Sequence, residues 1–111
     1  MVLVIPKTYI FTSPRRGNIV IKEINKDKII YTHNSSSFTI YIDFIIEAYR
    51  YFYGKSHVTV KDIEDFHDSI YKGMQSKAHC NYMFFIVLMS ELFGIPINED
   101  KGRGAPFYID L

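Results

Sequence analysis

The stretch that decides the fold is CNYMFFIVLMSELFG, residues 80–94. Apolar side chains fill every position from Met83 to Met89, so a helix formed here is apolar over most of its circumference. The run is well short of the roughly 20 residues that cross a bilayer. A helix that is hydrophobic all round is buried. We therefore expect this segment to run through the core, with two helices on one side and a sheet on another.

Length and composition predict one soluble domain spanning residues 1–111. The chain is 48% hydrophobic and 23% charged, which is enough apolar material for one core. The start of the chain lacks the basic segment and cleavage site of a signal peptide. Cys80 is the single cysteine, which excludes an intramolecular disulfide and favours a reducing, cytoplasmic compartment.

The charge is small overall but unevenly distributed. The formal net charge is +1, so no global field drives the protein onto nucleic acid. Residues 1–36 are nevertheless basic, and the segment from Asp62 to Asp68 is acidic. These two regions fit a nucleic acid or a complementary protein, and each also fits an ordinary solvated face.

Residues 1–40 have the pattern of an antiparallel β-meander. β-Branched runs at 19–24 and 29–31 flank the polar turn from Asn25 to Lys28, which predicts a hairpin. After a second turn at 34–37, the run FTIYI continues as a third strand. This part of the chain is expected to supply the sheet that covers the apolar helix.

Residues 41–111 predict three helices and a C-terminal hairpin. Apolar residues recur at helical spacing from 41 to 52, and Gly54 ends that helix. Thr59 caps a second helix together with Asp62, and its inward stripe is Ile63, Phe66 and Ile70. A third helix runs from about 76 to 93, and a hairpin with a long glycine-rich tip follows it. The fold class is α+β, with a winged-helix-like second part.

The start of the third helix has features of a nucleic-acid contact. Lys77, Asn81 and Phe85 share one stripe at steps of four residues. A helix N-terminus presents free N–H groups and a positive dipole end, which bind phosphate, and Asn pairs with adenine. The alternative is that Lys77 and Asn81 are only the exposed start of a core helix.

The spacing Lys77-xxx-Asn81-xxx-Phe85, followed by APFY at 105–108, resembles the Zα family of winged-helix domains. In that family the third helix carries Lys-xxx-Asn-xxx-Tyr and the wing carries Pro-Pro-x-Trp. Here Phe85 stands in place of the Tyr and Tyr108 in place of the Trp, and the wing is longer. The resemblance covers roughly residues 58–110. It implies a winged helix that binds duplex nucleic acid through Lys77, Asn81 and the wing residue Tyr108.

Two arginine-bearing loops extend this hypothesis. Arg103 lies between two glycines in the wing, where a long cationic side chain reaches a phosphate or a minor groove. Arg15 and Arg16 occupy the loop SPRRGN and form a modest anion site. The alternative for both loops is a solvated turn in which glycine supplies positive φ angles.

A second hypothesis places function on the apolar helix itself. If the other elements leave one side of it uncovered, Tyr82, Phe85 and Met89 form an interface, since Met and aromatic residues suit such surfaces. The protein would then be a homodimer or part of a heteromeric complex. It would act as a protein-interaction or inhibitor module, of the kind that viruses and mobile elements make, also using the acidic face at 62–68.

The sequence contains no residue set that indicates an enzyme, a metal site or a cofactor site. None of the four histidines (His33, His57, His67 and His79) has metal-ligand spacing to another histidine or to Cys80. His79 and Cys80 are adjacent, so their side chains diverge on a helix. We expect Cys80 to be a small buried hydrophobe and the protein to be non-enzymatic.

Overall fold

The computed structural model describes residues 10–12, 18–33, 35–71, 79–99 and 107–111. Within these ranges the chain is a mixed α+β protein, as the sequence predicts. The strands are β1 (Ile10–Thr12), β2 (Asn18–Ile24), β3 (Lys28–His33), β4 (Ser36–Tyr41), β5 (Val58–Thr59), β6 (Asn98–Glu99) and β7 (Phe107–Ile109). The helices are α1 (Ile42–Phe52), α2 (Val60–Tyr71) and α3 (His79–Phe93).

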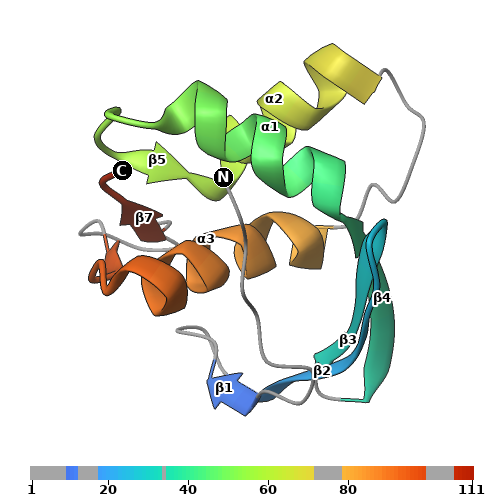
Figure 1. The fold of residues 1–111 in the computed structure, drawn as a ribbon. Helices are drawn as coiled ribbons and strands as arrows, with labels where there is room; N and C mark the ends of the chain where they lie inside the picture. Colours follow the sequence, from blue (N-terminus) through green and yellow to red (C-terminus); the bar gives the residue numbers. More distant parts are fainter. Residues whose placement is uncertain (1–9, 13–17, 34, 72–78, 100–106) are drawn as a thin grey trace.

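Strands β1 to β4 form one antiparallel sheet in chain order (Figure 1). The polar turn predicted between β2 and β3 is confirmed, and its geometry explains the choice of asparagine. The Asn25 Oδ1 atom accepts hydrogen bonds from the backbone N–H groups of Asp27 (2.8 Å) and Lys28 (3.0 Å). One face of the sheet carries the buried side chains, which are Ile19, Ile21, Ile29, Tyr31 and Ile40.

Helices α1 and α2 begin in different ways. No side-chain hydrogen bond caps α1; instead, the Ile42 N–H donates to the carbonyl of Asp27 (2.9 Å), which joins the helix to the β2–β3 turn. Helix α1 ends shortly before Gly54, whose φ of 81° is one that glycine adopts without strain. Helix α2 begins with the predicted capping box. The Asp62 N–H donates to Thr59 Oγ1 (3.2 Å), and the Thr59 N–H donates to Asp62 Oδ2 (2.9 Å).

A second sheet connects the end of the chain to the start of α2. Its strand order is β5-β7-β6, and both pairs are antiparallel. Val58 of β5 pairs with Ile109, and Asn98 of β6 pairs with Tyr108. The predicted C-terminal hairpin is confirmed in strands β6 and β7. The tip that was predicted to join them, residues 100–106, lies outside the described residues.

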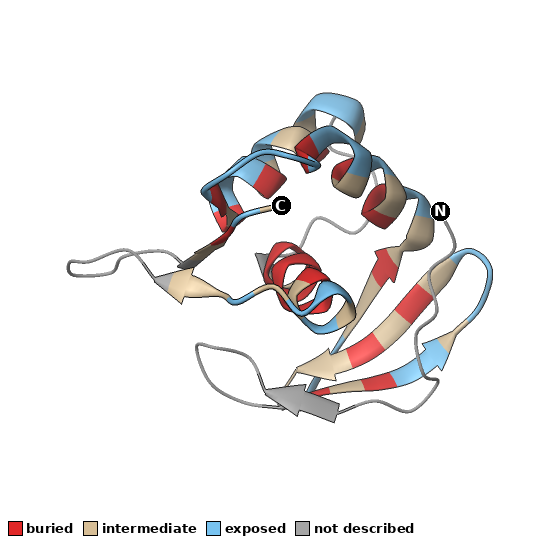
Figure 2. Cartoon of the chain, turned by 60° about the vertical axis from the view of Figure 1, so that its left-hand side comes forward, coloured by how far each residue is buried: buried red, intermediate tan, exposed pale blue. Residues whose placement is uncertain are grey.

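Helix α3 is the centre of the core, as its composition predicts. It lies between α1 and α2 on one side and the β2–β4 sheet on the other (Figures 1 and 2). All residues from 81 to 89 are buried. Stacked rings join this helix to the sheet, with the Phe84 and Tyr31 centroids 4.2 Å apart. None of the described helices is long and apolar enough to cross a membrane.

This arrangement corrects the predicted interface on α3. Tyr82, Phe85 and Met89 are 1%, 0% and 0% exposed within the single chain. The prediction that they contact another subunit is wrong, because the helices and the sheet together cover the whole circumference of α3 at these positions. The apolar run is explained by burial inside the fold.

Candidate functional site

Asn81 does not lie where a nucleic-acid contact must lie. Its side chain is 3% exposed. The Asn81 Oδ1 atom accepts a hydrogen bond from the Tyr31 hydroxyl (2.7 Å), and its Nδ2 group donates to the Thr39 carbonyl (2.8 Å). The predicted role of Asn81 in duplex binding is therefore wrong, because the β3–β4 part of the sheet occupies the face to which this side chain points.

Of the other predicted nucleic-acid contacts, only Tyr108 lies among the described residues. Lys77, Arg103, Arg15 and Arg16 lie outside the described residues, so duplex binding through them stays a prediction. Tyr108 is half-buried in β7, and its ring stacks on His57 with centroids 4.1 Å apart.

An open groove lies on the outer side of helices α1 and α2. It has a volume of about 450 Å³. Its lining combines aromatic or aliphatic side chains with two carboxylates and one hydroxyl: Tyr51, Phe52, Asp62, Asp65, Phe66, Ser69 and Ile70. Ile70 was predicted to face inward, but it is 43% exposed. Helical spacing places Ile70 on the same stripe as Ile63, which is why it was predicted to be buried. That prediction is wrong, because the described elements cover Ile63 but leave Ile70 exposed.

Aromatic rings from both helices form the apolar side of this groove. Tyr51 of α1 stacks on Phe66 of α2, with ring centroids 4.6 Å apart and planes tilted by 24°. Tyr51 remains 51% exposed despite this contact. The Lys55 Nζ atom lies 3.8 Å from the centroid of the Tyr51 ring. The exposed Tyr51 ring is thus in contact with the Lys55 ammonium group, and a cation is the kind of ligand that an aromatic face attracts.

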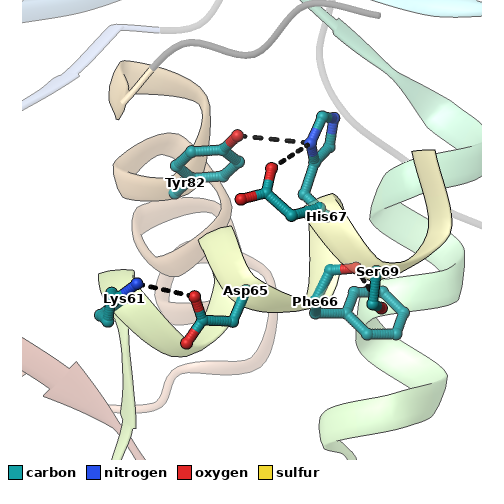
Figure 3. Close-up of polar contacts among 7 residues, drawn as sticks. Lys61, Asp65, Phe66, His67, Ser69 and Tyr82 are labelled. Carbon is teal, nitrogen blue, oxygen red and sulfur yellow. Dashed lines mark hydrogen bonds and ion pairs between the residues drawn. The ribbon is translucent and has the colours of Figure 1, made fainter. Parts of the chain in front are cut away.

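Carboxylates on α2 form the polar side of the groove. Asp62 and Asp65 are both exposed and lie three residues apart, on one side of the helix. Lys61 Nζ lies 2.8 Å from Asp65 Oδ1 (Figure 3). This hydrogen bond and the charge of Asp65 raise the pKa of the Lys61 ammonium, since they stabilise its charged form. Glu64 and Asp68 add to the negative charge of α2.

The opposite side of α2 is structural. Figure 3 shows the His67 ring beside Tyr82 of α3, with His67 Nδ1 3.3 Å from the Tyr82 hydroxyl oxygen. His67 is 4% exposed, and its ring also meets Phe44 edge to face at 5.0 Å. Burial raises the pKa of the Tyr82 hydroxyl to about 12, and the carboxylates of Asp68 and Glu64 act in the same direction.

The raised pKa of Tyr82 predicts a loss of stability in alkali. The pKa of tyrosine is near 10 in the unfolded chain, whereas burial raises the pKa of Tyr82 to about 12 in the folded chain. Unfolding therefore releases a proton in this interval, and the free energy of unfolding falls as the pH rises above about 10. Urea denaturation from pH 8 to 11.5 measures this slope.

Two variants test the assignment of that slope. Tyr82→Phe removes the buried hydroxyl and is expected to make the alkaline fall shallower, while Tyr31, whose pKa is also raised by burial, keeps its share of the slope. Tyr53→Phe is the matched control, because Tyr53 is 68% exposed. Equal slopes in wild type and Tyr82→Phe would contradict the assignment.

Sequence reasoning missed one further pair, formed by His33 and Cys80. The Cys80 Sγ atom lies 3.7 Å from His33 Nδ1, which connects β3 to the start of α3. Burial raises the pKa of the Cys80 thiol, so the thiol is not activated as a nucleophile. A separation of 47 residues gives no pattern that predicts this pair. Within the described ranges, no group of three or more metal-ligating side chains is present.

Comparisons of the chain with protein-family models, curated proteins and solved structures gave no match. Among the described residues, the groove between α1 and α2 is a surface on which exposed aromatic, aliphatic and charged side chains converge.

Proposed function

We propose that this protein is a non-enzymatic protein-interaction module whose partner docks in the groove between α1 and α2. The observation that carries the proposal is the exposure of Tyr51 and Ile70 along a groove of about 450 Å³. Aromatic and aliphatic side chains left exposed beside a concavity are typical of an interaction surface. The partner is a protein segment with apolar side chains that cover Phe66 and Ile70.

The lining of the groove favours a protein partner over a nucleic acid. Asp62 and Asp65 would face the phosphates of any duplex that approached this surface, and like charges repel. Aromatic rings and carboxylates in one groove instead match a mixed apolar and basic protein surface. The proposal moves the docking surface away from α3, whose side chains from 81 to 89 are buried, and keeps the acidic face of α2.

The order of elements supports the winged-helix resemblance as a companion proposal. From residue 42 on, the order is α1, β5, α2, α3, β6 and β7, with β7 between β5 and β6 in the sheet. The resemblance implies that the third helix contacts nucleic acid. Here the Phe84 ring of α3 stacks on Tyr31 of the N-terminal sheet. In such a winged helix the added sheet covers part of the third helix, while the α1–α2 groove stays accessible.

Site-specific photocrosslinking tests the proposed function. A photoreactive amino acid replaces Ile70 in one full-length variant and Tyr53 in the other, because both positions are exposed but only Ile70 lines the groove. In extracts of cells that express the protein, we expect position 70 to give a discrete crosslinked partner. Absence of a crosslink, or the same crosslinks from position 53, would overturn the proposal.

The crosslinked partner is then purified and its dissociation constant measured. Truncation of central apolar interface residues typically costs more than about 1 kcal/mol, so Tyr51→Ser and Ile70→Ser are expected to weaken binding about tenfold. Tyr53→Ser is expected to change binding less than about twofold. Thermal melting of each variant checks that the fold is retained. Equal affinities for all three variants would contradict docking in the groove.

A further inference from the structure

We propose that the partner segment that docks in the α1–α2 groove carries an arginine among apolar side chains. While the groove is empty, Lys55 and Lys61 of the chain itself occupy the two positions at the groove that attract a cation. This inference rests on the proposed function and specifies the chemistry of the partner. It is carried by two contacts that the chain makes with its own lysines at the groove.

The first cation position is the outer face of the Tyr51 ring. The inner face of that ring is covered, because Phe66 stacks on it with centroids 4.6 Å apart. That spacing leaves no room for an ammonium group between the rings, so Lys55 Nζ, 3.8 Å from the Tyr51 centroid, lies on the other face. The Tyr51 ring therefore presents one open face, and a cation occupies it.

The second cation position is the carboxylate of Asp65. Lys61 Nζ lies 2.8 Å from Asp65 Oδ1, and the two side chains are 73% and 60% exposed. An exposed pair of this kind is held loosely, since water competes for both ends. A cation from a partner can therefore replace Lys61 on Asp65 without unfolding any part of α2.

The surroundings of both positions match an arginine better than a lysine. Apolar side chains of Phe66 and Ile70 lie in the same groove as Asp62 and Asp65. A long aliphatic stem covers such apolar surface while its charged head stays in water. A guanidinium group is planar, stacks on aromatic rings and donates two parallel hydrogen bonds to one carboxylate, whereas an ammonium group is a point charge.

The charge balance of α2 supports a cationic occupant. Helix α2 carries one lysine and no arginine, and the lysine is Lys61. It carries four carboxylates, which are those of Asp62, Glu64, Asp65 and Asp68. When a guanidinium group of the partner replaces Lys61 at Asp65, the Lys61 ammonium group becomes hydrated or contacts the partner. Asp62 and Asp65, which line the groove, would repel an acidic segment.

The test uses two short peptides that differ in one group. The full-length 15N-labelled protein is titrated with acetyl-Leu-Ser-Arg-Leu-amide and with the same peptide containing citrulline, which keeps the shape of arginine but has no charge. We expect the arginine peptide to shift the amide signals of residues 51, 65, 66 and 70, and to bind at least about fivefold more tightly than the citrulline peptide, a difference of about 1 kcal/mol.

Matched charge variants test the role of Lys61. Lys61→Gln is expected to bind the arginine peptide at least about threefold more tightly, because the competing cation is gone. Lys26→Gln makes the same change in net charge at the exposed β2–β3 turn and is expected to leave the affinity unchanged. Asp65→Asn is expected to weaken binding about fivefold, whereas Asp27→Asn, also in that turn, is the control.

The outcomes separate this inference from the proposed function. If both peptides shift the groove signals with equal affinity, the groove binds an apolar segment without a cation, and only the present inference is overturned. If neither peptide shifts signals in the groove, docking there is contradicted as well. Equal affinities of Lys61→Gln and Lys26→Gln would overturn the assignment of Lys61 as the competing cation.

Discussion

Phe84→Ala is expected to lower the free energy of unfolding by about 3–5 kcal/mol, the largest effect of any substitution considered. Phe84 is fully buried on α3, and its ring stacks on Tyr31 of the N-terminal sheet at 4.2 Å. Truncation removes the burial of a whole ring and leaves a cavity between helix and sheet, which the surrounding side chains fill only in part. Urea denaturation, followed by circular dichroism, measures the change.

Phe93→Ala is the matched control for this prediction. Phe93 is the last residue of the same helix, is 44% exposed and stacks on Tyr49 at 5.3 Å. Its truncation is expected to cost about 1 kcal/mol or less, because nearly half of the Phe93 surface stays in solvent in the folded chain and its removal leaves no enclosed cavity. Equal losses for the two variants would contradict the central position of α3 between the two layers.

Asn81→Leu is expected to cost about 2–4 kcal/mol although it introduces an apolar side chain of similar size into the core. The substitution removes the acceptor for the Tyr31 hydroxyl and the donor to the Thr39 carbonyl. A buried polar group that loses its partner costs about 1–3 kcal/mol, and here two groups are affected. Chemical denaturation of wild type and variant gives the difference directly.

A double-mutant cycle shows whether the Tyr31 hydroxyl carries part of this cost. Tyr31→Phe removes the hydroxyl, so the double variant Tyr31→Phe with Asn81→Leu contains one unpaired polar group fewer than Asn81→Leu alone. We expect the double variant to be more stable than the sum of the single losses predicts, by about 1 kcal/mol. Additive losses would show that the two side chains act independently in the folded chain.

The two interpretations of Asn81 give opposite results in this experiment. A solvent-facing Asn81 that contacts nucleic acid would tolerate leucine with a change of about 0.5 kcal/mol or less in stability. The buried Asn81 seen here joins α3 to β3 and β4 and is 3% exposed. A near-neutral effect of Asn81→Leu would therefore contradict the placement of the N-terminal sheet on α3.

Local features of the fold could be predicted because short segments carry their own physical reasons. Asn25 between two β-branched runs predicted the β2–β3 turn, and Thr59 with Asp62 predicted the start of α2; both are confirmed. The apolar run from 83 to 89 predicted a core helix, because no exposed face can be assigned to such a sequence. The α+β class followed from these elements.

The candidate site could be predicted only in part. The acidic segment from 62 to 68 was visible as a charge pattern, and two of its carboxylates, Asp62 and Asp65, line the groove. Its aromatic partner Tyr51, eleven residues before Asp62, carried no signal, because contact between α1 and α2 depends on how the two helices pack. Ile70 was misplaced for a related reason: periodicity assigns it to the stripe of Ile63 but does not say where the covering elements end.

The amino-acid sequence by itself determined the turns, the caps and the identity of the central helix, since these depend on neighbours within a few residues. Only the tertiary structure decided which sides of the helices are covered. The N-terminal sheet packs on α3 and buries Asn81, while the outer stripe of α2 stays open at Ile70. Helical spacing shows which side chains share a face, but the burial of that face depends on elements far away in the sequence.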